Sequence, residues 1–262
     1  EFRRVLFRSS QSSSPYYNKS TDAYCYIGTE KPNHDVVIVG WDDSYSKDNF
    51  NTDLEGDGAF ICQNSWGDNF GENGFFYISY YDTNIGTHNV VYTDIENTDN
   101  YDHIYQSDLC GWVGQLGYNK DSIYGANVFT AEGNETLKAA SFYATGKDSQ
   151  YELYVVRQFE DETSLEKMIP VASGKLGNAG YYTVDFNQGI EVDAGERYAV
   201  VLYIITPGSV HPMAIEYAAD EATENVDLDD GESYISANGS KWVSVDTVEK
   251  SNLCIKAFSD NR

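Results

Sequence analysis

The sequence predicts a mainly β protein in two units, and three observations support this fold class. Short runs of β-branched and aromatic residues recur between Gly, Asn and Asp residues, as strands do between turns. Beyond residue 105, no segment keeps the 3.6-residue apolar period of an amphipathic helix. The 262 residues, 41% hydrophobic and 15% aromatic, suffice for two domains with packed cores.

The N-terminal residues differ from the rest of the chain. Residues 1–10 (EFRRVLFRSS) begin without Met, are rich in Arg and lack the apolar region and cleavage site of a signal peptide. Residues 9–15 (SSQSSSP) have the composition of a flexible linker. We therefore interpret residues 1–15 as a foreign or flexible leader, leave them out of the fold, and expect the remainder to be the C-terminal part of a longer protein.

Residues 16–93 are expected to form the first unit. Its strands are predicted at residues 35–41, 58–63, 74–81 and 89–93. The stretch 94–105 is polar and acidic with little periodicity, which favours a domain boundary there.

The second unit, residues 101–258, is predicted to be an antiparallel β-sandwich or jelly roll, because many short strands are separated by turns. Strands are expected at 126–130, 137–144, 151–159, 181–186, 197–205, 214–218, 233–236, 242–245 and 253–258. The clearest turn between strands is the pair Asn238 and Gly239.

The charge balance excludes one class of partner. With 17 basic and 42 acidic side chains the net charge is −25, so the chain repels polyanions and nucleic acid is not expected as a partner. The longest apolar run, residues 198–205, is far shorter than the roughly 20 residues of a membrane-spanning helix. No membrane span is predicted, and the high Tyr and low Lys content indicates a secreted protein.

The cysteines and histidines show no spacing typical of a metal site. There is no CxxC pair and no HxxxH pair, so no metal and no cofactor is expected. The four cysteines are interpreted as buried thiols in preference to two disulfides. They are Cys25, Cys62, Cys110 and Cys254.

Two motifs in the first unit indicate chemistry. Residues 33–41 read NHDVVIVGW, and residues 63–75 read QNSWGDNFGENGF. This ordered pair resembles the papain-like cysteine peptidases, whose C-terminal half carries an N-H-x-V-x-x-V-G strand and then an N-S-W-G-x-x-[WF]-G-x-x-G-[YF] segment. The resemblance covers about residues 16–92 and implies the C-terminal, β-barrel half of a papain-like catalytic domain.

The residue types in these motifs suit a Cys-His-Asn site. A Cys nucleophile acts as a thiolate, which a neighbouring imidazolium stabilises, and His34 fits that partner. The imidazole must be held through its other nitrogen, and the amide oxygen of Asn64 can do so. Trp66 is expected to cover the hydrogen bond between them. Cys62, on the strand before Asn64, is interpreted as a small buried hydrophobic residue.

The resemblance also implies two groups that this chain does not contain. In the family, the nucleophile opens a helix within a C-G-S-C-W type signature, and an upstream Gln supplies an oxyanion-hole amide. Cys25 lies nine residues before His34 outside any such signature, so we do not expect it to be the nucleophile. The nucleophile remains unidentified, and Cys25 stays open as an alternative.

Two acidic segments invite a calcium interpretation. Residues 53–58 imitate the start of an EF-hand loop, but the twelfth position would be Asn64 and a strand follows. The acidic run 216–232 has eight carboxylates without Lys or Arg and is interpreted as solvated, with calcium binding as the alternative.

The second unit resembles the lectin-like β-sandwich that follows the peptidase domain in some bacterial papain-like enzymes. The resemblance rests on residues 231–236 (GESYIS) and on Trp242. It implies that exposed aromatic rings stack on sugars, although aromatic residues at alternate strand positions also build cores.

The sequence therefore predicts the C-terminal portion of a bacterial papain-like cysteine endopeptidase, extracellular or at the cell surface. Its substrate would be a protein or peptide, with His34 as general base and acid and Asn64 as the residue that orients it. The 262-residue chain alone is expected to be inactive. The alternative is a glycan-binding or adhesion module that keeps an inactive peptidase remnant.

Overall fold

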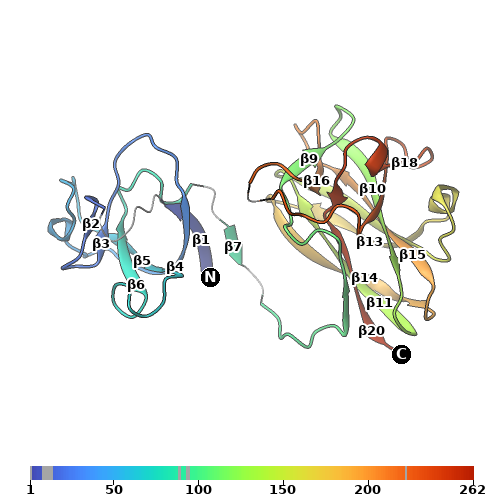
Figure 1. The fold of residues 1–262 in the computed structure, drawn as a ribbon, viewed down its shortest axis with the longest axis horizontal. Coiled ribbons are helices and arrows are strands. Elements are labelled where there is room, and N and C mark those ends of the chain that lie inside the picture. Colours follow the sequence, from blue (N-terminus) through green and yellow to red (C-terminus); the bar gives the residue numbers. More distant parts are fainter. Residues whose placement is uncertain (1, 8–13, 88–89, 93–94, 222) are drawn as a thin grey trace. The chain divides into compact units, whose positions relative to one another are not determined.

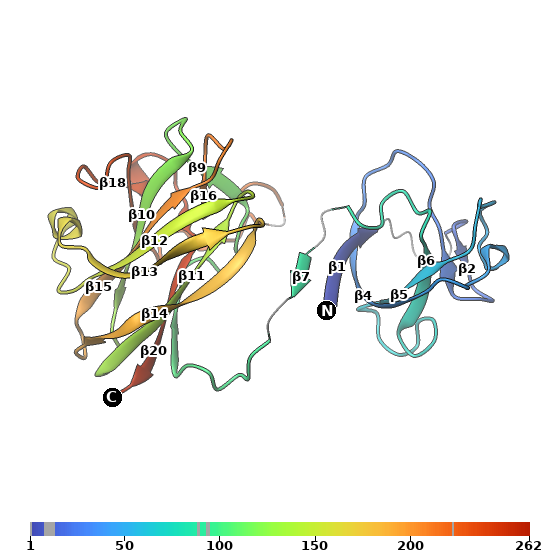
Figure 2. The same cartoon turned by 180° about the vertical axis from the view of Figure 1, so that it is seen from behind.

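The computed structural model describes residues 2–7, 14–87, 90–92, 95–221 and 223–262. These residues form two compact units, Glu1–Glu96 and Asn97–Arg262, both built mainly of antiparallel strands (Figures 1 and 2). The expected flexible leader at residues 9–15 falls mostly outside the described residues. The mainly β fold class is confirmed.

The first unit contains one seven-stranded sheet in the order β2-β3-β6-β5-β4-β1-β7. All its strand pairs are antiparallel except β3 with β6. The predicted strands at 35–41, 58–63 and 74–81 correspond to β4, β5 and β6. The strands are β1 (Phe2–Phe7), β2 (Tyr17–Asn18), β3 (Ala23–Tyr24), β4 (His34–Asp42), β5 (Ala59–Gln63), β6 (Phe75–Ser79) and β7 (Val90–Tyr92), with a short 3-10 helix η1 (Lys47–Asn49).

Strand β1 lies in the segment that we left out of the fold. It pairs with β4 from Arg3 opposite Ile38 to Phe7 opposite His34, and also with β7. One edge of β4 pairs with β5, and the other edge would leave its N–H and C=O groups unpaired. Strand β1 pairs there because a run with Val, Leu and Phe has a high strand propensity.

Both faces of this sheet carry apolar side chains. One core cluster comprises Tyr24, Tyr26, Val36, Ile38, Cys62, Phe76 and Ile78. The second comprises Ala23, Cys25, Phe50, Leu54 and Ala59. Strand β5 contributes Ala59 and Cys62 to different clusters, as expected for positions of opposite parity along a strand. The strand that precedes Asn64 is therefore fixed on both faces.

The second unit is a β-sandwich. A six-stranded sheet has the order β13-β12-β15-β10-β17-β18, a four-stranded sheet the order β14-β11-β20-β8, and a three-stranded sheet the order β19-β16-β9. The main core draws on all three sheets, with Leu202, Phe142 and Ile215 as examples. The strands are β8 (His103–Tyr105), β9 (Gly114–Leu116), β10 (Ser122–Thr130), β11 (Glu135–Ala144), β12 (Ser149–Val156), β13 (Ile169–Leu176), β14 (Gly180–Val192), β15 (Arg197–Ile205), β16 (Met213–Glu216), β17 (Glu232–Ser236), β18 (Val243–Ser244), β19 (Asn252–Leu253) and β20 (Ile255–Asn261), with 3-10 helices η2 (Glu162–Glu166) and η3 (Val245–Thr247).

Two sequence expectations change in this unit. Cys25, Cys62 and Cys254 are buried free thiols as expected, whereas Cys110 is exposed. The acidic run 216–232 is not solvated throughout, because Glu216 is fully buried and its Oε2 accepts a hydrogen bond from the Asn252 amide at 2.9 Å. A buried carboxylate needs hydrogen-bond donors. The sequence did not reveal this one, because its donor Asn252 lies 36 residues away in the chain.

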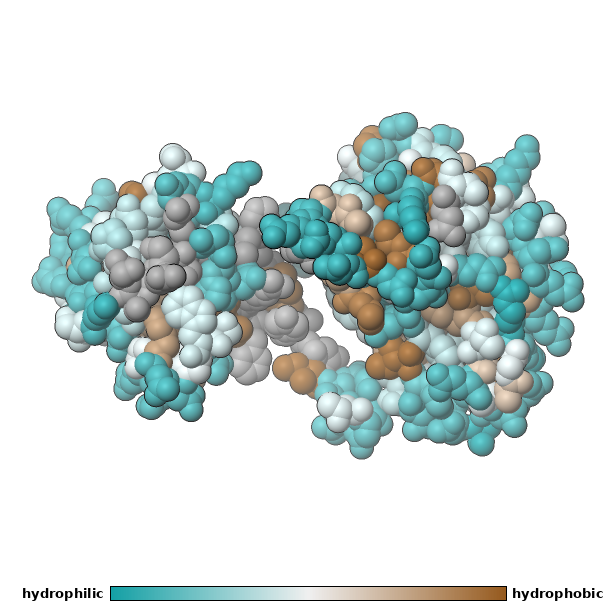
Figure 3. Space-filling model, viewed as in Figure 1, coloured by the Kyte–Doolittle hydropathy of each residue, from teal (hydrophilic) through white to brown (hydrophobic). Residues whose placement is uncertain are grey.

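Hydrophilic residues dominate the face of each unit shown in Figure 3, in keeping with the excess of acidic side chains. Among the described residues, no helical segment has the length and apolar character needed to cross a bilayer.

Candidate active site

His34 and Asn64 lie at neighbouring strand ends. His34 begins β4, Asn64 directly follows β5, and the two strands pair antiparallel with Val37 opposite Gln63. Antiparallel pairing brings the start of one strand to the end of the other. The His34 Nε2 and Asn64 Oδ1 atoms are 2.9 Å apart, so the expectation that these side chains lie within hydrogen-bond reach is confirmed.

The surroundings of Asn64 fix the direction of this hydrogen bond. Asn64 Oδ1 also accepts the backbone N–H of Ser65 at 2.8 Å, which identifies it as the oxygen and not the amide nitrogen. His34 Nε2 must then carry the proton that it donates to Oδ1. This tautomer leaves Nδ1 as the ring nitrogen that can accept a proton. Asn64 is only 7% exposed, so water competes little for Oδ1.

Trp66 supports the imidazole from one side. Its ring stacks on His34 with centroids 5.0 Å apart and an interplanar angle of 25°. Phe70 meets Trp66 edge-on at 4.9 Å, and Phe76 meets Phe70 edge-on at 5.4 Å, which links the imidazole to the core of the unit. Trp66 thus stacks on the His34 ring while 43% of its own surface is exposed, and its cover over the hydrogen bond stays a prediction.

The glycines of the second motif allow the turn that holds Asn64. Gly67, Gly71 and Gly74 all have positive φ. At Gly71 a Cβ atom would lie 2.1 Å from the carbonyl oxygen of Phe75, so a larger residue does not fit. The turn also places the Gly74 carbonyl 2.9 Å from the Asn64 N–H. The motif therefore requires glycine at position 71 for a direct steric reason.

Asp82 is a positioning residue that sequence reasoning missed. Its carboxylate is buried and accepts the N–H of Tyr26 at 2.7 Å and those of Asn84 and Ile85 at 2.8 Å. Asn84 in turn donates to the Glu30 carbonyl at 3.2 Å. The segment that leads into His34 is thereby fastened to the turn after β6. Burial raises the pKa of Asp82, although the three N–H donors oppose the shift.

The cysteines near this region have the properties of core residues. Cys25 is fully buried, and burial together with the charge of Asp82 raises the pKa of its thiol to about 12. Cys62 is also fully buried, with its pKa raised by burial and by Asp82, as expected for a small hydrophobic residue. A nucleophilic Cys needs a depressed pKa, so neither environment suits one.

Comparisons with known proteins agree with both units. Residues 4–95 match the papain family of cysteine proteases, and residues 104–259 match the family described as lectin like domain. None of the curated proteins matches the chain.

Two solved structures are similar over 100% of this chain. The first is the clostridial cysteine protease Cwp84 after propeptide cleavage, with 28% identity and a TM-score of 0.82. The second contains the cysteine protease and lectin-like domains of Cwp84, a surface layer associated protein of Clostridium difficile, with 26% identity and a TM-score of 0.78. This chain spans 66% and 59% of those two chains. The chain therefore belongs to the lectin-like domain family through residues 104–259, and its residues 4–95 match the papain family of cysteine proteases.

Proposed function

We propose that this chain is part of a bacterial cysteine endopeptidase, extracellular or at the cell surface, in which His34 is the general base and acid and Asn64 orients it. The observation that supports this role is the 2.9 Å hydrogen bond between His34 Nε2 and Asn64 Oδ1, with Trp66 stacked on the imidazole. It fixes the tautomer that leaves Nδ1 for proton transfer. Similarity to a surface layer associated protein supports the proposed surface location.

The thiol in this mechanism comes from a part of the protein outside these 262 residues. It transfers its proton to His34 Nδ1, and the thiolate attacks the carbonyl carbon of the scissile peptide bond. The imidazolium then gives the proton to the leaving amine as the C–N bond breaks, which leaves a thioester. Water then loses a proton to Nδ1 and attacks the thioester, the C–S bond breaks to release the acid, and the imidazolium returns its proton to the thiolate.

The test compares this chain alone with the chain joined to, or mixed with, a papain-like N-terminal half that carries its Cys. A fluorogenic peptide and an epoxide thiol-protease label measure turnover and labelling. We expect no activity from the chain alone, and activity on complementation. His34→Ala should then lower kcat by about 10²- to 10⁴-fold, the usual contribution of a general base, and Asn64→Ala should lower it less.

The matched control is His103→Ala, which removes a histidine of the other unit and should leave turnover unchanged. Turnover or labelling at Cys25 in the isolated chain would overturn the proposal and make Cys25 the nucleophile. Unchanged turnover in complemented His34→Ala would remove His34 from the mechanism.

A second proposed role concerns the lectin-like unit, which we assign to glycan binding. The observation that favours it is a set of aromatic side chains on the sheet surface, including the stacked pair Tyr124 and Tyr203 with ring centroids 4.2 Å apart. If this unit alone were functional, the chain would be an adhesion module with a peptidase remnant. Loss of peptide turnover in His34→Ala of the complemented enzyme would favour the peptidase role over an adhesion module that carries a remnant.

A further inference from the structure

One face of the six-stranded sheet turns away from the main core. On β15, Tyr198, Val200, Leu202 and Ile204 belong to the main core, so the alternate residues from Arg197 to Ile205 lie on the opposite face. Part of that face is covered by a small cluster that includes Leu165 of η2. The part near the β12-β13 edge carries a pocket instead.

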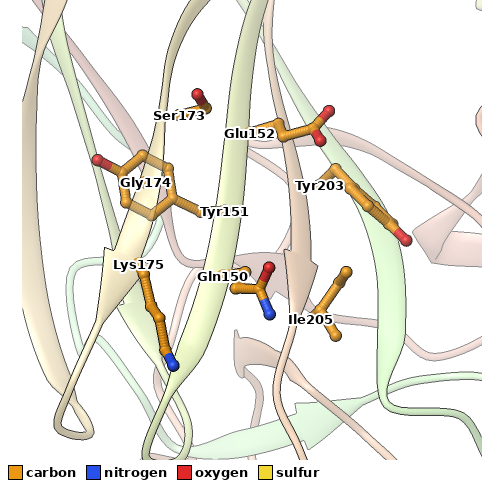
Figure 4. Close-up of a pocket in the computed structure, with 8 residues that line it drawn as sticks. All are labelled: Gln150, Tyr151, Glu152, Ser173, Gly174, Lys175, Tyr203 and Ile205. Carbon is orange, nitrogen blue, oxygen red and sulfur yellow. The ribbon is translucent and has the colours of Figure 1, made fainter.

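This pocket has a volume of about 380 Å³, within the range of small-molecule sites. It is lined by side chains of three neighbouring strands, which Figure 4 shows together. In the register, Gln150 lies opposite both Lys175 and Ile205, and Glu152 lies opposite both Ser173 and Tyr203. These six residues therefore form two cross-strand rows on one face of the sheet. The rows place a carboxylate, an amide, an ammonium group, a hydroxyl and a phenol around one depression.

Several of these groups are held in place before any ligand arrives. The Tyr154 hydroxyl donates to Glu152 Oε2, which orients the carboxylate. Tyr203 stacks on Tyr124 with an interplanar angle of 21°, and Trp242 meets Tyr124 edge-on at 6.2 Å. A ring fixed by such neighbours loses little conformational entropy when it contacts a ligand.

Lys175 differs from these fixed groups. Its ammonium lies 3.4 Å from Asp148, but both side chains are more than half exposed. An ion pair in water stabilises its geometry only weakly. Lys175 can therefore turn toward a ligand in the pocket without losing a strong contact.

We propose that this pocket binds a neutral, hydroxyl-rich glycan. This proposal rests on the glycan-binding role given above for the lectin-like unit and names the site within it. Glu152 and Gln150 offer acceptors and donors to sugar hydroxyls, Lys175 and Ser173 offer donors, and Tyr203 presents an aromatic ring beside them. The net charge of −25, with Glu152 and Asp148 at the site, disfavours anionic polymers.

An extended peptide is the competing occupant, because β13 is an edge strand. Peptide addition to an edge uses backbone N–H and C=O groups, and Pro170 removes one N–H from β13. The pocket offers mainly side-chain groups on the sheet face, which match hydroxyls distributed around a sugar ring. These two features favour the glycan.

The experiment uses the full 262-residue chain and measures binding by isothermal titration. The probes are neutral hexose oligosaccharides, N-acetylhexosamine oligosaccharides, polygalacturonate as the anionic glycan, and an unstructured peptide. We expect a neutral oligosaccharide to bind, with an affinity at least tenfold lower in Tyr203→Ala and in Glu152→Gln. Glu152→Gln keeps the shape of the side chain, so a loss of affinity there is not a loss of folding.

The matched control is Tyr181→Ala, which removes an exposed tyrosine from β14 in the other large sheet and should not change the affinity. Equal binding by wild type and both pocket variants would overturn this site while leaving glycan binding by the unit intact. Binding of no neutral oligosaccharide, or of only the anionic glycan or the peptide, would overturn both. Peptidase activity in the complemented enzyme is measured separately and is not affected by these outcomes.

Discussion

Glu135 is a carboxylate that is fully buried in the sandwich. The Tyr105 hydroxyl lies 2.7 and 2.8 Å from its two oxygens, the Gly133 N–H donates at 2.8 Å, and the Ser259 hydroxyl donates to Oε2. Burial alone would favour the neutral acid. The hydrogen bonds from Ser259, Tyr105 and Gly133 outweigh it and hold the pKa of Glu135 below its usual value.

The stability of the sandwich should therefore fall in acid. Because the folded pKa is depressed, ionised Glu135 contributes stability above its unfolded pKa, and this contribution is lost as the pH falls through the folded pKa. Glu135→Gln has a single acceptor oxygen, so it leaves buried donors unpaired and should lower the free energy of unfolding by about 1–3 kcal/mol at pH 7. Urea unfolding at pH 7 and pH 3 measures both effects.

Glu191→Gln serves as the control, since Glu191 is an exposed carboxylate that pairs with Arg262. It should change stability little at either pH. A gap between wild type and Glu135→Gln that is as large at pH 3 as at pH 7 would contradict the role of the ionised carboxylate.

The sequence predicted the His34 and Asn64 pair but not the residue that fastens the segment before it. His34, Asn64 and Trp66 stand in a motif whose spacing is set by one strand, a loop and a turn. Asp82 acts through the Tyr26 N–H, 56 residues away in the chain. Its only local signal is an Asp followed two residues later by Asn84, whose N–H it accepts, a pattern that many turns share. A contact of this kind depends on how the sheet places two distant segments together.

At the scale of elements, the turn between β5 and β6 offers a sharp comparison between two glycines. Gly71 has φ of 56° and no room for a Cβ, whereas Gly67 has φ of 80° and nothing within 4 Å of a Cβ. Gly67→Ala should cost only the left-handed strain, about 1–2 kcal/mol. Gly71→Ala should cost more, because it also displaces the Phe75 carbonyl. Thermal unfolding of the two variants measures the difference.

The same substitutions should affect the site unequally. Displacement of Phe75 moves the turn that holds Asn64, so Gly71→Ala should perturb the His34 imidazole resonances in an NMR spectrum and Gly67→Ala should perturb them less. Equal stabilities and equal spectra for the two variants would contradict the steric role of Gly71.

The predicted strands of the second unit show which elements a sequence reveals. Strand β15 was predicted with its observed bounds, because residues 197–205 are nearly continuous in apolar residues. Strand β13 was missed, because Pro170 argues against a strand and most of its residues are exposed. It exists at the sheet edge, where the partner strand β12 supplies the hydrogen bonds on one side. Edge strands depend on their neighbours more than on their own sequence.

In the chain as a whole, each unit has its own core. The segment that connects the units is anchored to the sandwich at Tyr101. The Tyr101 hydroxyl donates to Asp185 at 3.0 Å, and its ring lies 4.9 Å from that of Phe258. Asp102 accepts the N–H of Asn261 at 2.8 Å. The sandwich therefore begins at about Tyr101, a few residues after the exposed stretch 95–100.

Limited proteolysis with a broad-specificity protease should cut first within residues 95–100 and leave a stable C-terminal fragment, because exposed backbone outside the sheets is cleaved first. Mass spectrometry locates the cut, and circular dichroism of the fragment should keep its β signal. Tyr101→Ala removes the anchor and should extend cleavage toward β8. Tyr182→Ala removes a tyrosine of β14 whose hydroxyl donates to the nearby Asn178 carbonyl, and it should leave the cleavage site unchanged. First cuts inside the sandwich, or loss of the β signal on separation, would show that the second unit does not fold by itself.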